Sequence, residues 1–192
     1  MLTSNAQRGF SLIELAITIV VLAVLVSLAA PSMFQFNANS KILGVAELFV
    51  ASAQKARTEA IRRNEPVELI LTNQTASASS VDTTGLTNSG PNWLIRTAPL
   101  ATGAGHAFID GKAAAEGGGN NPVVIAANAS SVQFNALGVL TGGNAVTVDF
   151  SHTGSACEPT GSTRCLRVVV SSGGQARLCD PAVTAAADNR KC

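Results

Sequence analysis

Four cysteines, all within the last 36 residues of the 192-residue chain, are the side chains whose chemistry is most restricted. In a chain with an export-type N-terminus, an even number of cysteines is typical of disulfides formed in an oxidising compartment. Their spacing does not match the C-x-x-C pairs of zinc sites, and no histidine stands beside them. We therefore predict two disulfides and no metal. Of three possible connectivities we favour nearest neighbours, Cys157 with Cys165 and Cys179 with Cys192.

The remaining reactive side chains form no pattern that is typical of catalysis. His106 and His152 are isolated, and Asp149, three residues before His152, does not complete a site with it. No nucleophile-elbow serine and no H-E-x-x-H motif is present. The glycine run 117–119 lacks the Lys-Ser/Thr that follows in phosphate-binding loops. We expect no catalytic residue, no enzymatic activity and no cofactor.

One carboxylate, Glu14, interrupts the longest apolar segment, residues 10–30. As a helix this segment would be about 32 Å long, which matches the hydrocarbon thickness of a bilayer. An ionisable group within a membrane span costs free energy and therefore indicates a function. Arg8 is the only basic residue before the segment. We expect the N-terminus in the cytoplasm, residues 10–31 in the membrane, and everything after Pro31 on the far side.

An ordinary cleaved signal peptide is the alternative interpretation of this segment, because Ser27-Leu28-Ala29 resembles a cleavage site. The apolar run is longer than the roughly 7–15 residues usual for signal peptides. A signal peptide also gains nothing from a carboxylate such as Glu14. A membrane anchor is therefore the favoured interpretation.

The next segment has the pattern of an amphipathic helix. Apolar residues recur at steps of three and four, and Pro66 disfavours helix at the residue before it. We expect one helix over residues 10–63, about 80 Å long. Residues 32–65 are its amphipathic continuation, and the apolar face there is expected to be covered by the domain's own sheet. Arg57, Arg62 and Arg63 are expected to be solvated. The apolar face consists of Ile42, Ala46, Phe49, Ala53, Ala56 and Ala60.

The remaining residues, 66–192, alternate short β-favouring runs with Gly-, Ser- and Asn-rich stretches. The expected class is α+β, a long N-terminal helix packed on antiparallel sheet with a disulfide-stapled C-terminal region. Residues 72–91 and 98–122 carry few structural signals and are expected to form long surface loops. The expected strands are 67–71, 93–96, 107–109, 123–126, 132–134, 146–150, 166–171 and 176–178.

The first residues resemble the type III signal of type IV prepilins and pseudopilins. The stretch 7–15, Gln-Arg-Gly-Phe-Ser-Leu-Ile-Glu-Leu, combines a short polar leader, a Gly-Phe junction and a carboxylate in an apolar helix. The resemblance implies that a prepilin peptidase removes residues 1–9 by cutting after Gly9 and methylates the new amino terminus of Phe10. Glu14 of one subunit is then expected to pair with the Phe10 amine of a neighbour during assembly.

Residues 53–63 resemble the end of the long helix in the GspH/FimT group of minor pilins, where Ala-Arg-x-Glu-Ala-Ile-Arg-Arg leads into the first strand. Trp93 and the Phe134-x-x-x-Gly138 pattern fit the same group. The resemblance implies the type IV pilin fold. It also implies pilins or pseudopilins, both minor and major, as partners through the N-terminal helix.

Two structural roles are consistent with this resemblance. The first is a minor pilin of a type IV pilus machine, which helps assembly begin. The second is the minor pseudopilin, protein H, of a type II secretion system. The paired C-terminal cysteines are more similar to the FimT/FimU pilus branch, so the first role is favoured.

A third role, capture of DNA by a tip pilin, is less favoured. Some FimT-like proteins use a Gly-Arg-x-Arg motif, and residues 174–177 keep only its second arginine, Arg177. Acidic residues reduce the surrounding region to a net charge of about +2, and the whole chain carries +1. Phosphate binding needs several clustered cations. The other cations that could contact DNA are Arg164, Arg167, Arg190 and Lys191.

Overall fold

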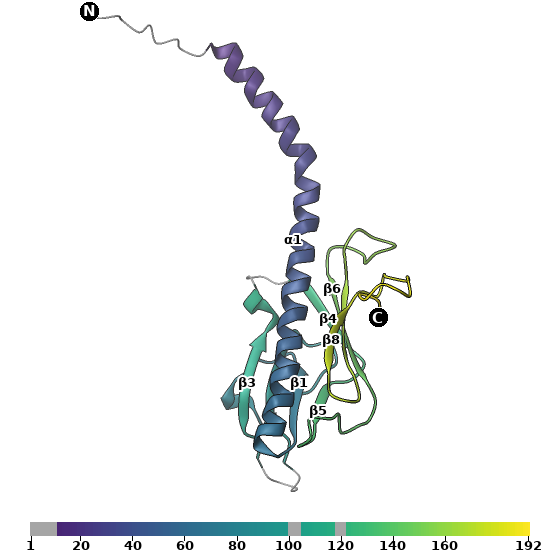
Figure 1. Cartoon of the computed structure of the whole chain (residues 1–192). Helices are drawn as coiled ribbons and strands as arrows, with labels where there is room; N and C mark the ends of the chain where they lie inside the picture. Colours follow the sequence, from purple (N-terminus) through teal and green to yellow (C-terminus); the bar gives the residue numbers. More distant parts are fainter. Residues whose placement is uncertain (1–10, 100–104, 118–121) are drawn as a thin grey trace, which may run out of the picture. The chain divides into compact units, whose positions relative to one another are not determined.

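The computed structural model describes residues 11–99, 105–117 and 122–192. The chain forms two compact units, Met1–Asn37 and Ala38–Cys192. A single helix, α1 (Leu12–Arg63), contributes to both (Figure 1). The expected start of this helix at Phe10 lies outside the described residues.

Both ends of α1 follow from local residues. The Ser11 hydroxyl accepts a hydrogen bond from the Ile13 N–H at 3.3 Å, which is an N-cap. At the other end Asn64 adopts a left-handed conformation with φ of 52°. The N–H groups of Asn64 and Glu65 donate to the carbonyls of Ile61 and Ala60, and the two bonds form a Schellman motif. The predicted end of the helix at Arg63 is thus confirmed.

Eight strands follow within the described residues, and they pair into two four-stranded antiparallel sheets. Each strand expected from the sequence is present. The first sheet has the order β3-β2-β1-β5 and the second β4-β6-β7-β8. The strands are β1 (Val67–Thr72), β2 (Asn92–Thr97), β3 (Phe108–Ala113), β4 (Val123–Ala127), β5 (Ser131–Phe134), β6 (Val146–His152), β7 (Leu166–Val170) and β8 (Ala176–Cys179).

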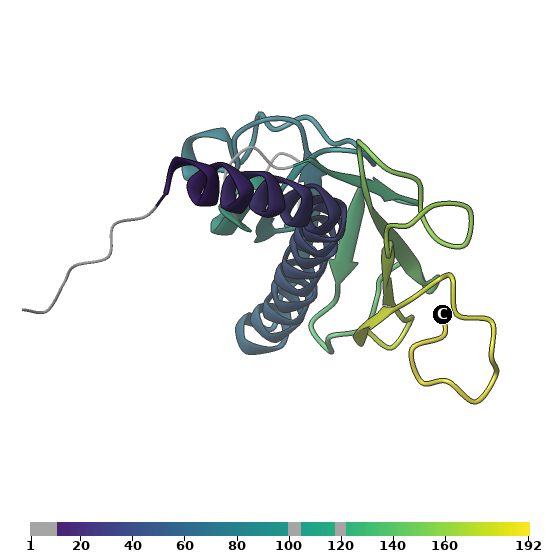
Figure 2. The same cartoon turned by 90° about the horizontal axis from the view of Figure 1, so that it is seen from above.

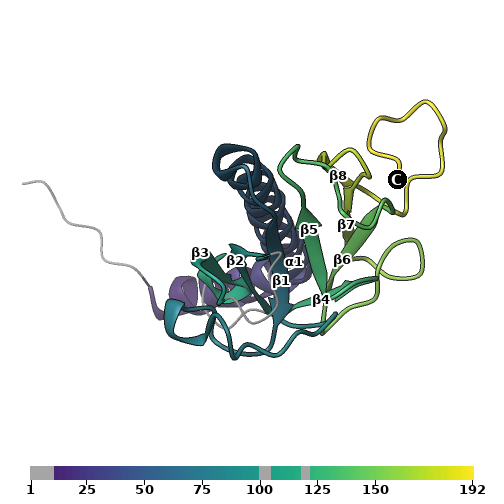
Figure 3. The same ribbon diagram turned by 90° about the horizontal axis from the view of Figure 1, so that it is seen from below.

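The C-terminal part of α1 lies along the inner faces of the sheets, and the second sheet extends past it toward the C-terminal segment (Figures 2 and 3). All six apolar residues predicted for its buried face are buried, at most 1% exposed. Phe49 lies where the layers meet. Its ring is 5.4 Å from Trp93 on the first sheet and 5.8 Å from Phe150 on the second. One helix face therefore joins both sheets in a single core.

The segment 72–91, expected to be a surface loop, instead covers the outer face of the first sheet. Val81 packs there with Ile70 and Leu94 in a second, smaller core. The segment contains a short 3₁₀ helix, η1 (Ala78–Ser80). The physical reason is that β1 and β2 carry apolar side chains on both faces, and the outer set must also be shielded from water.

The second expected loop, 98–122, also needs correction. Strand β3 continues to Ala113 and is followed by the 3₁₀ helix η2 (Ala114–Gly117). Gly111 allows β3 to approach the covering segment, because a Cβ atom there would lie 2.6 Å from the Ala76 carbonyl oxygen. Residues 100–104 and 118–121 lie outside the described residues.

Candidate functional site

The N-terminal part of α1 presents a continuous apolar surface with one charge. Every described side chain of residues 11–29 and 32–37 is exposed, including Glu14 in the first turn. This helix is long and apolar enough to cross a membrane. The sequence has no basic residue between Arg8 and Lys41. A cation for Glu14 must therefore come from the chain's N-terminal end or from another molecule.

Polar groups within this apolar segment are satisfied by the helix itself. The hydroxyls of Thr18, Ser27 and Ser32 each donate to the carbonyl three residues earlier, at 2.8 Å. Internal hydrogen bonding of this kind is required in a lipid environment, where no water is present to bind a hydroxyl. The structure gives the Glu14 carboxylate no such local partner. Gly9 and Phe10, the predicted processing residues, lie outside the described residues.

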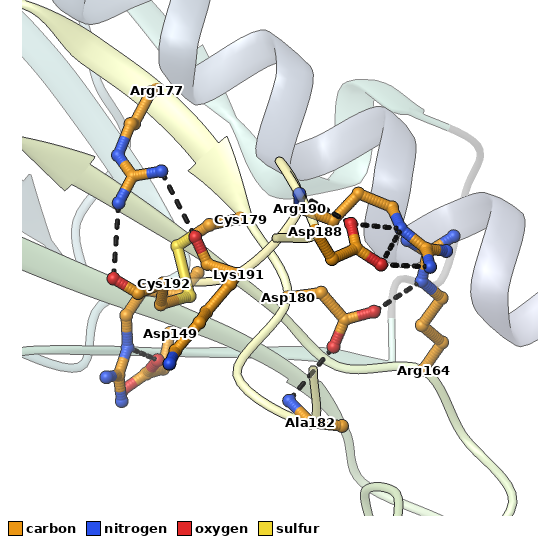
Figure 4. The surroundings of a disulfide bond; sticks show 11 residues. Asp149, Arg164, Arg177, Cys179, Asp180, Ala182, Asp188, Arg190, Lys191 and Cys192 are labelled. Atoms are coloured by element: carbon orange, nitrogen blue, oxygen red, sulfur yellow. Dashed lines mark hydrogen bonds and ion pairs between the residues drawn. A yellow bond between two sulfur atoms is a disulfide. The ribbon is translucent and has the colours of Figure 1, made fainter. Parts of the chain in front are cut away.

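Two disulfides hold the C-terminal region. Cys157 is bonded to Cys165 and Cys179 to Cys192, which is the nearest-neighbour connectivity. The second bond closes a loop over residues 180–192 at the end of β8 (Figure 4). Loops of this size restrict the unfolded chain and stabilise the fold by about 2.5–3 kcal/mol each in the chain-entropy model.

Most of the cations proposed for DNA contact are already engaged by acidic groups. Arg167 makes a bidentate pair with Asp149, at 2.6 and 2.9 Å, across β6 and β7. This hydrogen bonding raises the pKa of Arg167. Arg190 binds Asp188 at 2.6 Å, and its hydrogen bonds lower the pKa of that carboxyl to about 2.

Arg164 connects the two disulfide loops and the helix. Its guanidinium donates to the buried Asp180 at 2.7 Å (Figure 4), while its backbone N–H donates to the Asn39 side chain of α1 at 2.9 Å. Asp180 also accepts a hydrogen bond from the Ala182 N–H at 3.0 Å. This ion pair therefore organises the loop after β8.

Arg177, the one residue retained from the DNA-binding motif, also holds the chain. Its guanidinium donates to the carbonyls of Lys191 and Cys192, at 3.1 and 3.2 Å (Figure 4). These interactions are intramolecular and fix the C-terminal segment against β8. The structure brings Arg177 and Lys191 together, but it places Arg164, Arg167 and Arg190 with separate carboxylates.

The histidines do not assemble into a catalytic group in the described structure. His106 lies 2.9 Å from Asp82 and 3.8 Å from Glu68, and Glu68 pairs with the buried Arg96 at 2.6 Å. This network attaches the covering segment to the first sheet. The His152 ring nitrogen accepts from the Gly154 N–H at 3.0 Å within its own turn.

The contact of Arg57 was missed by sequence reasoning. Arg57, expected to be solvated, is half-buried and donates through Nε to the carbonyl of Gly138 at 3.0 Å. The two residues are 81 positions apart. No local pattern in the sequence could have paired them, because the contact depends on how the sheet folds back onto α1.

Comparisons with known proteins agree with these features. The sequence model of the family described as type II transport protein GspH matches residues 45–174, and the prokaryotic N-terminal methylation motif matches residues 4–30. No curated protein matches the chain.

The chain is also similar to solved structures. The type IV minor pilin FimU of Pseudomonas aeruginosa is 16% identical with a TM-score of 0.53, over 74% of this chain and 91% of that chain. The minor pseudopilin EpsH from the type 2 secretion system of Vibrio cholerae is 14% identical with a TM-score of 0.47, over 76% of this chain and 99% of that chain. The FimU match shows that this arrangement of helix and sheets is the pilin fold. The GspH sequence model matches about two thirds of the residues of this chain. The chain therefore belongs to the GspH family of minor pilins and pseudopilins.

Proposed function

We propose that this protein is a minor pilin incorporated into a type IV pilus, where its role is structural and not enzymatic. The observation that carries the proposal is the exposed apolar helix with a single carboxylate, Glu14. A soluble domain gains nothing from such a surface, whereas a subunit that moves from membrane to filament needs it in both environments.

The proposed mature chain begins at Phe10, with residues 1–9 removed as a leader. Residues 10–31 anchor it in the inner membrane and form the filament core, and residues 32–65 continue the helix. Residues 66–192 form the periplasmic β-rich part, with the N-terminus in the cytoplasm. Prepilin peptidase and the inner membrane are thus its first partners. Mass spectrometry of the exported protein should show a methylated Phe10, whereas an N-terminus near Ala30 would contradict this processing.

Charge at the start of α1 gives Glu14 its proposed role. Phe10 directly precedes the helix N-cap, Ser11, in the sequence, and a cation near the positive end of a helix dipole is disfavoured. The Glu14 carboxylate of an adjacent subunit neutralises that amine and removes the penalty of its own burial among apolar helices. Pairing of the two charges sets the axial register between subunits.

Substitution of Glu14 by Val tests this role. We expect the variant to remain in the membrane fraction in normal amount, since Val removes a charge from the apolar segment. Its amount in sheared filaments should fall at least about tenfold, because the Phe10 amine loses its partner. Leu15→Val, which changes the neighbouring apolar side chain without altering charge, is the matched control. Normal incorporation of Glu14→Val would refute the proposal.

The second candidate is the minor pseudopilin of a type II secretion system, and it is favoured by the description of the matching family, type II transport protein GspH. Deletion of the gene distinguishes the two. Loss of surface pili with normal secretion of folded exoproteins supports the pilus role. Loss of exoprotein secretion with normal pili supports the secretion role.

DNA capture is a weaker candidate. Arg164, Arg167 and Arg190 each bind a carboxylate, and Arg177 binds two backbone carbonyls. A phosphate would have to displace these partners before it gained any contact. Lys191 is the remaining cation of the proposed set, and one positive charge does not make a nucleic-acid-binding surface, which needs several clustered cations.

A further inference from the structure

Arg57 carries a half-buried positive charge that no carboxylate neutralises within the described ranges. Its one hydrogen bond given by the structure goes to the neutral carbonyl of Gly138, at 3.0 Å. The nearby Arg62 and Arg63 differ, since both bind Glu59, at 2.6 and 2.8 Å. A partly desolvated guanidinium gains most from a charged acceptor, so Arg57 is left with unused binding capacity.

A groove of about 360 Å³ opens beside this side chain. Arg57 lines it together with Gln54 and Thr58 from α1. The other side is closed by Gly174 and Gln175 from the turn between β7 and β8, and by Ala176 at the start of β8. The amide side chains of Gln54 and Gln175 can donate hydrogen bonds to an oxygen ligand, whereas the Thr58 hydroxyl already donates to the Gln54 carbonyl at 2.9 Å. The groove thus combines one positive charge, several neutral donors and no negative charge among its lining residues.

The walls of the groove are fixed by close backbone packing. Gly174 has a positive φ of 79°, and a Cβ atom there would lie 1.9 Å from the Gly138 carbonyl oxygen and 3.3 Å from the Arg57 Nε. Only glycine permits this approach. The two turns and the guanidinium therefore hold one another in place, and the groove is formed before any ligand binds.

Two exposed apolar side chains lie at or beside the Gly138 turn, whose carbonyl binds Arg57. Leu137 is 79% exposed and Ile61 51% exposed. Ile61 lies beside the turn that carries Leu137, because a Cβ atom on Gly138 would lie 2.7 Å from the Ile61 Cδ1. The turn that presents Leu137 is ordered by Asn135, whose side-chain oxygen accepts from the N–H groups of Leu137 and Val139 at 2.9 and 3.1 Å. An exposed leucine on an ordered turn beside a charged groove is a suitable anchor for a protein partner.

We propose that this groove binds a carboxylate side chain of a neighbouring filament subunit, and that Leu137 and Ile61 contact apolar residues beside that carboxylate. A single guanidinium with neutral donors matches a singly charged carboxylate better than a doubly charged phosphate. The apolar pair matches a polypeptide and not a small acid. The inference rests on the proposed function, because the partner is another subunit of the same filament.

Thr58→Glu is the test substitution, with Thr58→Lys as its matched control. Thr58 is exposed and its hydroxyl binds only the Gln54 carbonyl of its own helix, so both variants should fold. The introduced carboxylate competes for Arg57, whereas the lysine does not. Arg57→Gln is less suitable alone, since it also removes the bond to Gly138.

The measurement is photo-crosslinking from Gln175, on the opposite wall, in the full-length chain expressed in its own cells. We expect a crosslink to a filament subunit at a peptide that contains Asp or Glu. Thr58→Glu should lower its yield at least about tenfold, whereas the yield with Thr58→Lys, which adds a second cation to the groove, should stay well above that of Thr58→Glu. Conversion of the mapped carboxylate to Lys should restore the yield with Thr58→Glu.

Equal crosslinking of the two Thr58 variants, a mapped peptide without an acidic residue, or failure of the charge reversal to restore the yield would overturn the inference. The sheared filament fraction separates this result from failure of the proposed function. A chain present in filaments without the crosslink contradicts only the groove. A wild-type chain absent from filaments contradicts the proposed function and the inference with it.

Discussion

The indole N–H of Trp93 donates a hydrogen bond to the hydroxyl of Ser52, 2.9 Å away, in the buried contact between β2 and α1. The Ser52 hydroxyl in turn donates to the Leu48 carbonyl at 2.9 Å, so both polar groups are satisfied without water. Phe49, one turn earlier, packs edge-on against the same indole. This polar contact inside an apolar interface fixes how far along the sheet the helix lies.

Ser52→Ala is expected to lower the free energy of unfolding by about 1–3 kcal/mol, because it leaves the buried indole N–H without an acceptor. Thr58→Ala is the matched control. Its hydroxyl makes the same kind of bond, to Gln54, on the exposed side of the same helix, and its loss should have little effect. Urea unfolding of residues 32–192 measures both. Equal stabilities of the two variants would show that the Trp93 contact is not important.

Two arginine–aspartate pairs allow a second comparison. In the Arg164 pair the acid, Asp180, is only 5% exposed, whereas in the Arg167 pair Asp149 is 42% exposed. Arg164→Ala leaves a carboxylate buried and should cost about 1–3 kcal/mol of stability. Arg167→Ala leaves a solvated carboxylate and should cost at most about 1 kcal/mol.

Urea unfolding of residues 32–192 under oxidising conditions measures the free energy of unfolding of both variants. The disulfides remain intact there, so a difference between the variants reports on the ion pairs alone. The reverse order, with Arg167→Ala more damaging, would contradict the role assigned to Asp180 in organising the loop after β8.

Glu59 predicts a pH dependence of stability. Hydrogen bonds from Arg62 and then Arg63 lower the pKa of Glu59 from 4.5 to about 2. A carboxyl whose pKa is lower in the folded state stabilises the fold above its unfolded pKa. That contribution is lost as the pH falls from about 4.5 to about 2.

Thermal melting of the wild type and Glu59→Gln over this range checks the prediction. At pH 7 the variant should melt about 1–3 °C lower, and the two curves should converge near pH 2. A gap that persists unchanged at pH 2 would assign the effect to side-chain packing instead of charge.

The parts of this fold that the sequence predicts are those with local periodicity. The spacing of Ile42, Phe49 and Ala60 gives the buried face of α1, and the alternation over β6 gives its inward-facing Val148 and Phe150. A proline after Arg63 gives the end of the helix. These patterns are visible in the sequence because each depends only on residues that are close to one another along the chain.

Contacts between distant residues could not be predicted in this way. The second core, where Val81 covers Ile70 and Leu94, depends on the path of a segment that has no periodicity of its own. The contact of Arg57 with Gly138 and the pair of Arg164 with Asp180 join separate elements. The Arg177 contacts depend on the C-terminal loop closing over β8, which charge counting cannot show.

Arg177 leads to the final prediction, which concerns DNA. Its guanidinium already holds the carbonyls of Lys191 and Cys192, and the three other arginines of the region hold carboxylates. Binding to DNA releases its condensed counterions only if cations of the protein reach the phosphates, and here the arginines must first break these contacts.

We expect a gel-shift titration of residues 32–192 to show no salt-sensitive binding at about 10 μM protein, in the range of ordinary non-specific affinities. Arg177→Ala should give the same result as the wild type. A shift that weakens with salt and disappears in Arg177→Ala would show that the loop opens to expose the guanidinium, and DNA capture would then replace the structural role assigned to this arginine.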